Sequence, residues 1–173
     1  KDIVLSVNIS AKNISNISFV EKVKKILAET QFPARNLEIE ITEYCLIESV
    51  DDAIENIKAL RNIGVQVALD DFGTGYTSLS YLAKMPINLL KIDKSLVDDI
   101  EKDKKSRDFV NTVISLGHQM GCDVISEGVE TEQQLHILGD NNCDFVQGYV
   151  WSRPLDLNIA KDLANDEPKA AGK

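Results

Sequence analysis

Short apolar runs rich in β-branched residues alternate along the chain with longer segments whose apolar residues recur every three or four positions. The short runs have the length and composition of buried parallel strands, and they cover 3–9, 37–41, 65–70, 88–93, 123–126 and 145–150. The longer segments predict amphipathic helices at 19–31, 49–64, 78–85, 106–121 and 132–141. The pattern is therefore a repeated strand–helix unit, and no low-complexity segment divides it.

Residues that favour helix ends stand where this pattern needs them. Ser49 and Thr131 precede helical segments and suit N-caps. Gly64 and Gly121 follow helical segments, where a left-handed residue closes a helix. Pro86 ends the short segment before it. These signals support the predicted order of elements.

Strict alternation of strand and helix implies a parallel sheet, either doubly wound or closed as a (β/α)8 barrel. Barrels gather their sites at the carboxyl ends of several strands, and polar residues lie near six such ends: Asn8, Glu40, Asp70, Lys91, Glu127 and Gln147. A doubly wound sheet would place its site at one switch point, and "GTGYTS" lacks the third glycine of a dinucleotide-binding loop. We therefore predict a TIM-type barrel. A complete barrel has eight βα units, so we expect an incomplete one with about six, lacking units at its N-terminus.

Composition narrows the class of partner. The chain has 173 residues, 27% of them charged, and a formal net charge of −9. This acidic balance disfavours a long nucleic acid, whose phosphates need a basic surface. No apolar run reaches the length of a membrane span, so we expect no membrane contact. The three cysteines (Cys45, Cys122 and Cys143) are widely spaced and odd in number, which favours reduced thiols in a cytoplasmic protein.

Two adjacent carboxylates, Asp70 and Asp71, separate an apolar strand from a glycine-containing loop. Like charges this close repel, so a cation is expected beside them; the alternative is a helix N-cap with a solvated neighbour. Glu40 shares a strand face with Glu38 and is the better ligand candidate, because it lies nearer the barrel mouth. Carboxylates without a histidine or thiolate set favour Mg²⁺ or Mn²⁺. Two such ions that share a carboxylate ligand would activate a water molecule to attack the phosphorus of a phosphodiester.

The remaining polar positions have a functional and a structural interpretation. Lys91 lies between apolar neighbours, and because an unpaired buried ammonium is costly, we expect it to face anionic ligands. Glu43 is as well explained as a carboxylate bracing a loop as by direct chemistry. Glu127 and Glu130 follow a strand, and the alternative for both is capping of the next helix.

Six blocks of the sequence together resemble the EAL domains, bacterial cyclic di-GMP phosphodiesterases. They are "VNISAKNI", "LEIEITE", "DDFGTGYTSLSYL", "LLKIDKSLV", "ISEGVETEQQ" and "QGYVWSRPL", in the family's order and spacing. The resemblance implies a modified (β/α)8 barrel that opens cyclic di-GMP to linear pGpG with Mg²⁺ or Mn²⁺, two ions being expected in the intact domain.

The resemblance also implies a role for each matching residue. Asn8, Glu40, Asp70 and Asp71 match metal ligands, with Asp70 as the expected bridge between two ions. Lys91 matches the lysine that engages the attacking water, and Glu127 matches a carboxylate proposed as general base or second-metal ligand. A further set is expected to contact the substrate or to support the ligands: Glu43, which would brace the loop after Asp71, Asp93, Glu130 and Gln147.

The Glu-Ala-Leu block that names the family, and that carries a metal ligand, is absent from the sequence. We therefore expect residues 1–157 to form the C-terminal two-thirds or so of an EAL domain, and 158–173 a final helix and frayed tail. An isolated piece of this kind should be inactive, and its unpaired edge strands should favour homodimers or other self-association. Upstream sensor or diguanylate cyclase domains would suit a longer parent, either free in the cytoplasm or as the cytosolic part of a membrane-bound sensor. The alternative function is a cyclic di-GMP receptor or regulatory module without turnover.

Overall fold

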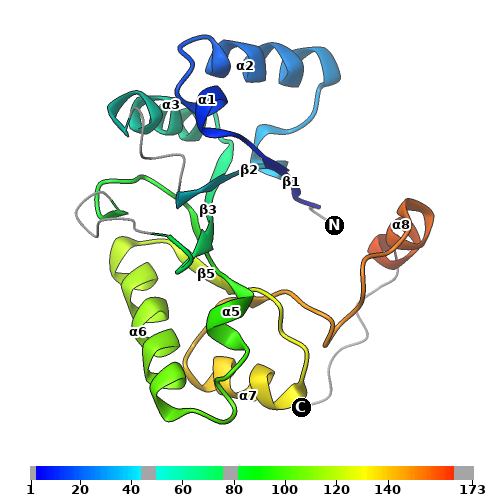
Figure 1. The fold of residues 1–173 in the computed structure, drawn as a ribbon. Helices are drawn as coiled ribbons and strands as arrows, with labels where there is room; N and C mark the ends of the chain where they lie inside the picture. The colour runs from blue at the N-terminus through cyan, green and yellow to red at the C-terminus, as the bar shows by residue number, and fades with distance from the viewer. Residues whose placement is uncertain (1–2, 44–49, 76–81, 166–173) are drawn as a thin grey trace.

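A single parallel sheet organises the chain (Figure 1). The computed structural model describes residues 3–43, 50–75 and 82–165. Within these ranges six strands follow one another in the order of the sequence. They are β1 (Leu5–Asn8), β2 (Leu37–Thr42), β3 (Gln66–Phe72), β4 (Leu89–Ile92), β5 (Asp123–Ser126) and β6 (Phe145–Val146). All five neighbouring pairs are parallel, as predicted from the apolar runs.

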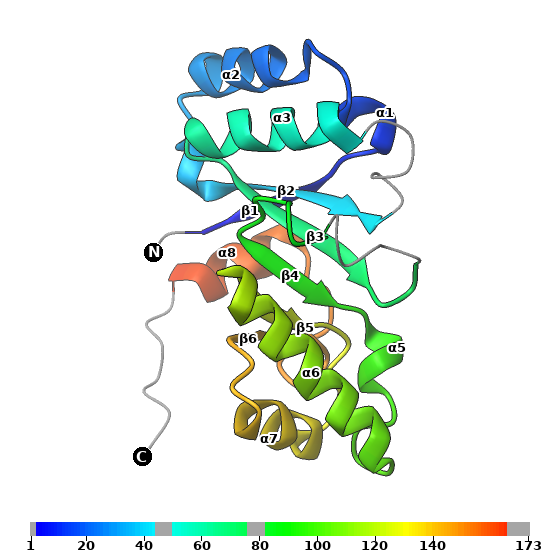
Figure 2. The ribbon, with the colours of Figure 1, turned by 90° about the vertical axis from the view of Figure 1, so that its left-hand side faces the viewer.

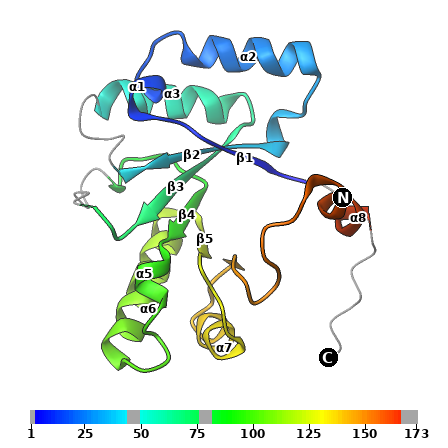
Figure 3. The same ribbon diagram turned by 45° about the vertical axis from the view of Figure 1, so that its right-hand side comes forward.

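The sheet curls into an open half-barrel with helices on its convex side (Figures 2 and 3). Helices α2 (Phe19–Thr30) and α3 (Val50–Asn62) lie over its first half, and α6 (Lys104–Met120) and α7 (Glu132–Asp140) over its second. Shorter elements connect them: α1 (Ala11–Ile14), the 3₁₀ helix η1 (Ala34–Asn36) and α5 (Lys94–Val97). Helix α8 (Leu157–Asn165) stands apart from the helices on the convex side (Figure 3). The arrangement is that of a partial TIM-type barrel, as predicted.

Alternation along the strands separates an apolar layer from a polar one. Ile39, Val67 and Leu90 are buried between the sheet and its helices, whereas their neighbours point to the concave side. There the side chains border a cavity of about 730 Å³, lined in part by Ser6, Glu38, Glu40, Gln66 and Lys91. The concave side of the sheet therefore forms a partly polar hollow, which Glu40 and Lys91 border near the carboxyl ends of their strands.

Most predicted helix ends are found in the structure. Thr131 caps α7 in a reciprocal capping box with Gln134, and Gly121 closes α6 at φ 74°. Gly64 follows α3 at φ 90°, where a left-handed residue is required. Ser49 lies outside the described residues, as does the first half (78–81) of the predicted helix 78–85.

No helix among the described residues is both long and apolar enough to cross a membrane. The two outer strands of the open sheet leave apolar side chains accessible, including Leu5 on β1 at 52% and Phe145 on β6 at 53%. An edge of this kind has unpaired backbone groups as well as exposed apolar side chains.

Candidate metal site

A β-bulge brings the two adjacent aspartates into one site. Leu69 pairs with Leu90 and Phe72 with Ile92, so two residues of β3 stand opposite one residue of β4. Asp71, the second of them, has φ 56°, a left-handed conformation that aspartate tolerates better than most residues. In a regular strand these neighbours would point to opposite faces. The bulge removes that alternation and allows both carboxylates to serve the same rim.

Lys91 is the cation at the centre of this rim. Its Nζ lies 2.6 Å from Glu40 Oε1, 2.9 Å from Asp70 Oδ1 and 2.8 Å from Glu127 Oε1. Burial lowers the pKa of Lys91, but its close contacts with these three carboxylates outweigh burial and hold that pKa well above its ordinary value. Lys91 therefore remains an ammonium; it donates a hydrogen bond to Glu40 and forms ion pairs with Asp70 and Glu127.

Three carboxylates at this rim have the spacing of a metal site. One oxygen each from Asp70, Asp71 and Glu127 lies within 4.8 Å of the others. Burial, followed by the charges of Asp70 and Asp93, raises the pKa of Asp71. Burial likewise raises the pKa of Glu127, although Lys91 opposes the shift. One ammonium therefore offsets only part of the negative charge, and an all-oxygen donor set suits a hard divalent cation.

Two of the predicted supporting carboxylates hold backbone next to the cluster. The N–H of Gly73, in the loop after Asp71, donates to Glu43 Oε1 at 3.0 Å. Glu43 thus braces that loop. Asp93 follows Lys91 by two residues and caps α5, accepting from the backbone N–H of Ser95 at 2.9 Å.

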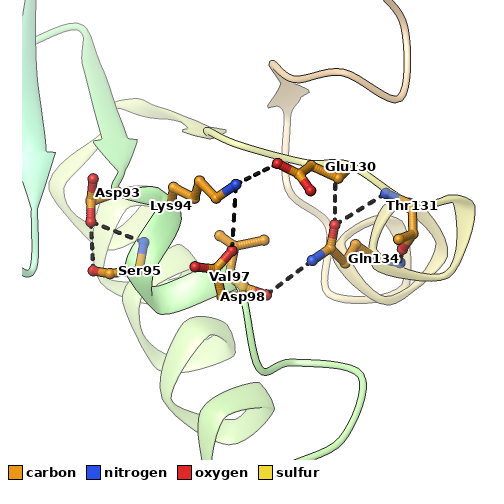
Figure 4. A network of polar contacts seen from close by, with 8 residues as sticks. All are labelled: Asp93, Lys94, Ser95, Val97, Asp98, Glu130, Thr131 and Gln134. Carbon is orange, nitrogen blue, oxygen red and sulfur yellow. Dashed lines mark hydrogen bonds and ion pairs between the residues drawn. The ribbon is translucent and has the colours of Figure 1, made fainter.

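The other predicted residues lie further from the acids. Asn8 pairs in register with Glu40 at the end of β1 but is exposed. Gln147 is also exposed and borders the 730 Å³ cavity. Glu130 forms an ion pair with Lys94 of α5 (Figure 4). Among the described residues, neither Asn8 nor Gln147 has a side-chain hydrogen bond to the acidic cluster.

Sequence reasoning missed two features of this site. The bulge was not predicted. Its signal is the pair of adjacent polar residues at the end of β3, because regular alternation would place only one of them on the concave face. The four-residue helix α5 was also missed, because it is too short for a periodic pattern. Its signal is the Asp93–Lys94–Ser95 stretch, in which a capping residue directly follows a strand.

The sequence matches a known protein family over most of its length. A family described as "EAL domain" matches residues 1–154. The cyclic di-GMP phosphodiesterase NbdA of Pseudomonas aeruginosa is 40% identical over 159 residues, which cover 92% of this chain and 20% of NbdA. The chain thus spans about a fifth of the length of that relative.

Solved structures agree with the sequence comparison. The EAL enzyme Bd1971, in a form with cAMP and cyclic di-GMP bound, has a TM-score of 0.88 at 35% identity, over 92% of this chain and 42% of Bd1971. A complex of Klebsiella pneumoniae BlrP1 with manganese and cyclic di-GMP has a TM-score of 0.79 at 30% identity, over 87% of this chain and 39% of BlrP1.

Proposed function

Because the chain belongs to the EAL domain family, we propose that its acidic rim takes part in the metal-dependent hydrolysis of cyclic di-GMP to linear pGpG. The names of its relatives and the ligands of its structural neighbours support this assignment. The observation that carries the proposal is the convergence of Glu40, Asp70 and Glu127 on Lys91. Such a concentration of buried charge is costly unless it serves a ligand.

The donor set defines which residues would hold a cation. Asp70, Asp71 and Glu127 would be its core, and we propose Asn8 and Glu40 as further ligands from the neighbouring strand ends. Mg²⁺ and Mn²⁺ both suit oxygen ligands of this kind. Bound there, the metal would lower the pKa of a water molecule and offset charge on the phosphate.

Lys91 and Glu127 would have different roles toward the attacking water. As a permanent ammonium, Lys91 cannot accept a proton, but it can donate a hydrogen bond to water or to a phosphate oxygen. Lys91 donates a hydrogen bond to Glu40 at 2.6 Å, whereas Asp70 Oδ1 has no hydrogen-bond partner among the described residues, so a water bound to Lys91 would take the place of its ion-pair contact with Asp70 or Glu127. Glu127 Oε1 lies 2.8 Å from Lys91 Nζ; if Glu127 holds the cation through one oxygen, its other oxygen is the one proposed to take the proton from water.

Supporting roles follow from the remaining contacts. We propose that Glu43 keeps the loop after Asp71 in place through Gly73, and that Gln147, at the border of the cavity, contacts the nucleotide. Asp93 and Glu130 would act through α5. A cytoplasmic location, self-association through the exposed edge strands and the presence of sensor or diguanylate cyclase domains in a longer parent also remain proposals.

A chimera tests the proposed activity. Residues 1–154 of this chain would replace the matching segment of the NbdA EAL domain, which supplies the rest of the barrel. With Mn²⁺, we expect the chimera to convert cyclic di-GMP to pGpG, followed by chromatography. Asp70→Asn in the chimera should abolish turnover, because the substitution removes the charge of a carboxylate central to the cluster. Asp108→Asn is the matched control, since Asp108 is exposed and forms an ion pair with Lys104 of the same helix.

The same chimera separates the enzyme from the receptor. A folded chimera that binds cyclic di-GMP in a titration but forms no pGpG would support the non-catalytic module and contradict the proposed hydrolysis. We expect the isolated 173-residue chain to show little or no turnover in either case.

A further inference from the structure

Helix α5 lies between the two loops that carry the acids of the candidate metal site. It begins at Lys94, three residues after Lys91, and is anchored to β4 by its Asp93 cap. One of the two loops follows Asp71 at the end of β3, and the other begins with Glu127 at the end of β5. Since α5 follows the strand between β3 and β5 in the sheet, it is placed to contact both.

Leu96 of α5 occupies the space above the first loop. Gly73 has φ +104°, and a Cβ added to it would lie 2.4 Å from Leu96 Cδ1. A Cβ at residue 73 would have to displace Leu96, and φ +104° also favours glycine. The Gly73 N–H is at the same time bound to Glu43. The loop after Asp71 is thus held by Glu43 through its backbone and covered by Leu96.

Lys94 of α5 makes the equivalent contact with the second loop, where its side chain extends toward Glu130 (Figure 4). Gly128 has φ +67°, and an added Cβ would lie 2.4 Å from Lys94 Cγ. The aliphatic stem of Lys94 therefore lies directly against Gly128, while its ammonium pairs with Glu130. The Lys94 and Glu130 side chains are each 46% exposed, so the ion pair itself adds little. The close packing of the stem is the stronger constraint.

Gln134 provides a second link between α5 and this loop. Its side chain is almost fully buried; its Oε1 accepts from the Glu130 N–H at 2.8 Å, and its Nε2 donates to the Val97 carbonyl of α5 at 3.4 Å (Figure 4). The loop is also fixed from the far side, because the Val129 N–H donates to the Gln147 carbonyl at 3.1 Å. The backbone next to Glu127 is therefore held on both sides.

We propose that α5 is a positioning element that sets the distance between Asp71 and Glu127, through Leu96 on one loop and the Lys94 stem on the other. The inference rests on the proposed function, because it takes these carboxylates to be metal ligands. Their oxygens lie within 4.8 Å of each other although they come from separate strands. Residues that orient ligands in this way commonly change metal affinity by 10- to 100-fold when they are replaced.

Hydrogen exchange in the metal-free 173-residue chain tests the contacts directly. Lys94→Ala removes the stem, and we expect the Val129 amide to exchange about fivefold faster or more, as for a locally loosened segment. Lys94→Met keeps the stem and removes the charge, and it should leave that exchange rate unchanged. Leu96→Ala should speed exchange of the Gly73 amide instead. Lys104→Ala, at an exposed pair on α6, is the control for loss of a surface lysine.

Manganese affinity, measured by calorimetry on the same chain, tests the consequence for the site. Lys94→Ala and Leu96→Ala should each weaken Mn²⁺ binding by about tenfold, and Lys94→Met should not. Gly128→Ala should also weaken it, because the new Cβ displaces the Lys94 stem. Combining Gly128→Ala with Lys94→Ala removes that clash, so the combined loss should be smaller than the sum of the two.

Hydrogen exchange and Mn²⁺ affinity together distinguish a failure of the positioning role from a failure of the proposed function. If the native chain binds no Mn²⁺, the metal assignment fails, and the exchange rates alone decide whether α5 holds the loops. Native exchange at Val129 in Lys94→Ala would overturn the positioning role. Equal effects of Lys94→Met and Lys94→Ala would overturn it as well, because they would place the constraint in the exposed ion pair.

Discussion

Replacing Lys91 by methionine should unfold the metal-free chain at a much lower temperature. Lys91 is 7% exposed in its side chain and is shared by Glu40, Asp70 and Glu127, whose side chains are 9%, 12% and 19% exposed. Methionine retains the apolar stem, so the change isolates the lost charge. Breaking a buried ion pair by removing one partner costs about 3–5 kcal/mol. At about 2–4 °C per kcal/mol for a chain of this size, the expected fall in Tm is about 6–20 °C.

Differential scanning calorimetry in a chelating buffer measures this fall, with Lys104→Met as the control for an exposed pair worth at most about 1 kcal/mol. The folded-state pKa of Lys91 is raised, so its contribution is fully present below the ordinary lysine pKa of 10.5 and is lost only at higher pH. Titration of Lys91 itself should therefore not change the difference in Tm between the native chain and Lys91→Met below about pH 9.

Adding Mn²⁺ should then restore much of the lost stability. A metal at 100 times its dissociation constant stabilises a protein by about 2.7 kcal/mol. In the native chain the metal must compete with Lys91 for Asp70 and Glu127, so the rise in Tm should be larger in Lys91→Met than in the native chain. A variant that melts within about 2 °C of the native chain in chelator, or that gains nothing from Mn²⁺, would refute this reasoning.

Three further predictions concern other parts of the molecule. Asp71→Asn should raise the metal-free Tm at pH 7 and abolish the Mn²⁺-induced rise, because the raised pKa of Asp71 marks a negative charge that the folded state disfavours. The gain in Tm should be full above the folded-state pKa of Asp71 and vanish below pH 3.8, its ordinary pKa. A lower Tm of Asp71→Asn in chelator at pH 7 would contradict this prediction. Cys143 is half-buried, and burial raises its pKa to about 11. It should therefore react with iodoacetamide at pH 8 far more slowly in the folded than in the urea-unfolded chain, as peptide mass spectrometry can measure, and equal rates would contradict the raised pKa. Gly117→Ala should destabilise the chain to urea by about 1–3 kcal/mol, since its Cβ would lie 2.4 Å from Val124 Cγ2, whereas Gly139→Ala in α7 meets nothing within 4 Å and should stabilise it; equal effects would contradict the packing of α6 on β5.

The parallel strands could be predicted because their apolar runs are buried on the convex side and carry the signal locally. The same holds for Thr131 and Gly121, whose capping roles depend on neighbours a few residues away. The carboxyl-end positions of Asp70, Lys91 and Glu127 followed from the strand pattern, since parallel strands end at a common rim.

The geometry within the rim depends on contacts between strands, so it could not be predicted from sequence patterns that involve only neighbouring residues. The bulge at Asp71 requires the register of β3 against β4. Lys91 was expected to face an anionic ligand, whereas it is paired with three carboxylates of the chain itself. Gly128 is required because Lys94, which is distant in sequence, packs against it. A local sequence pattern cannot predict a contact of this kind.

Anomalous diffraction from crystals of the 173-residue chain soaked in Mn²⁺ tests the central claim most directly. We predict an anomalous peak about 2.1 Å from oxygens of Asp70, Asp71 and Glu127, with Asp70 or Glu127 displaced from Lys91. The same soak of Asp70→Asn should show no peak there. A fully soaked native crystal in which Lys91 keeps all three carboxylates, and in which manganese is absent from the rim or bound elsewhere, would contradict the metal site and the phosphodiesterase chemistry proposed from it.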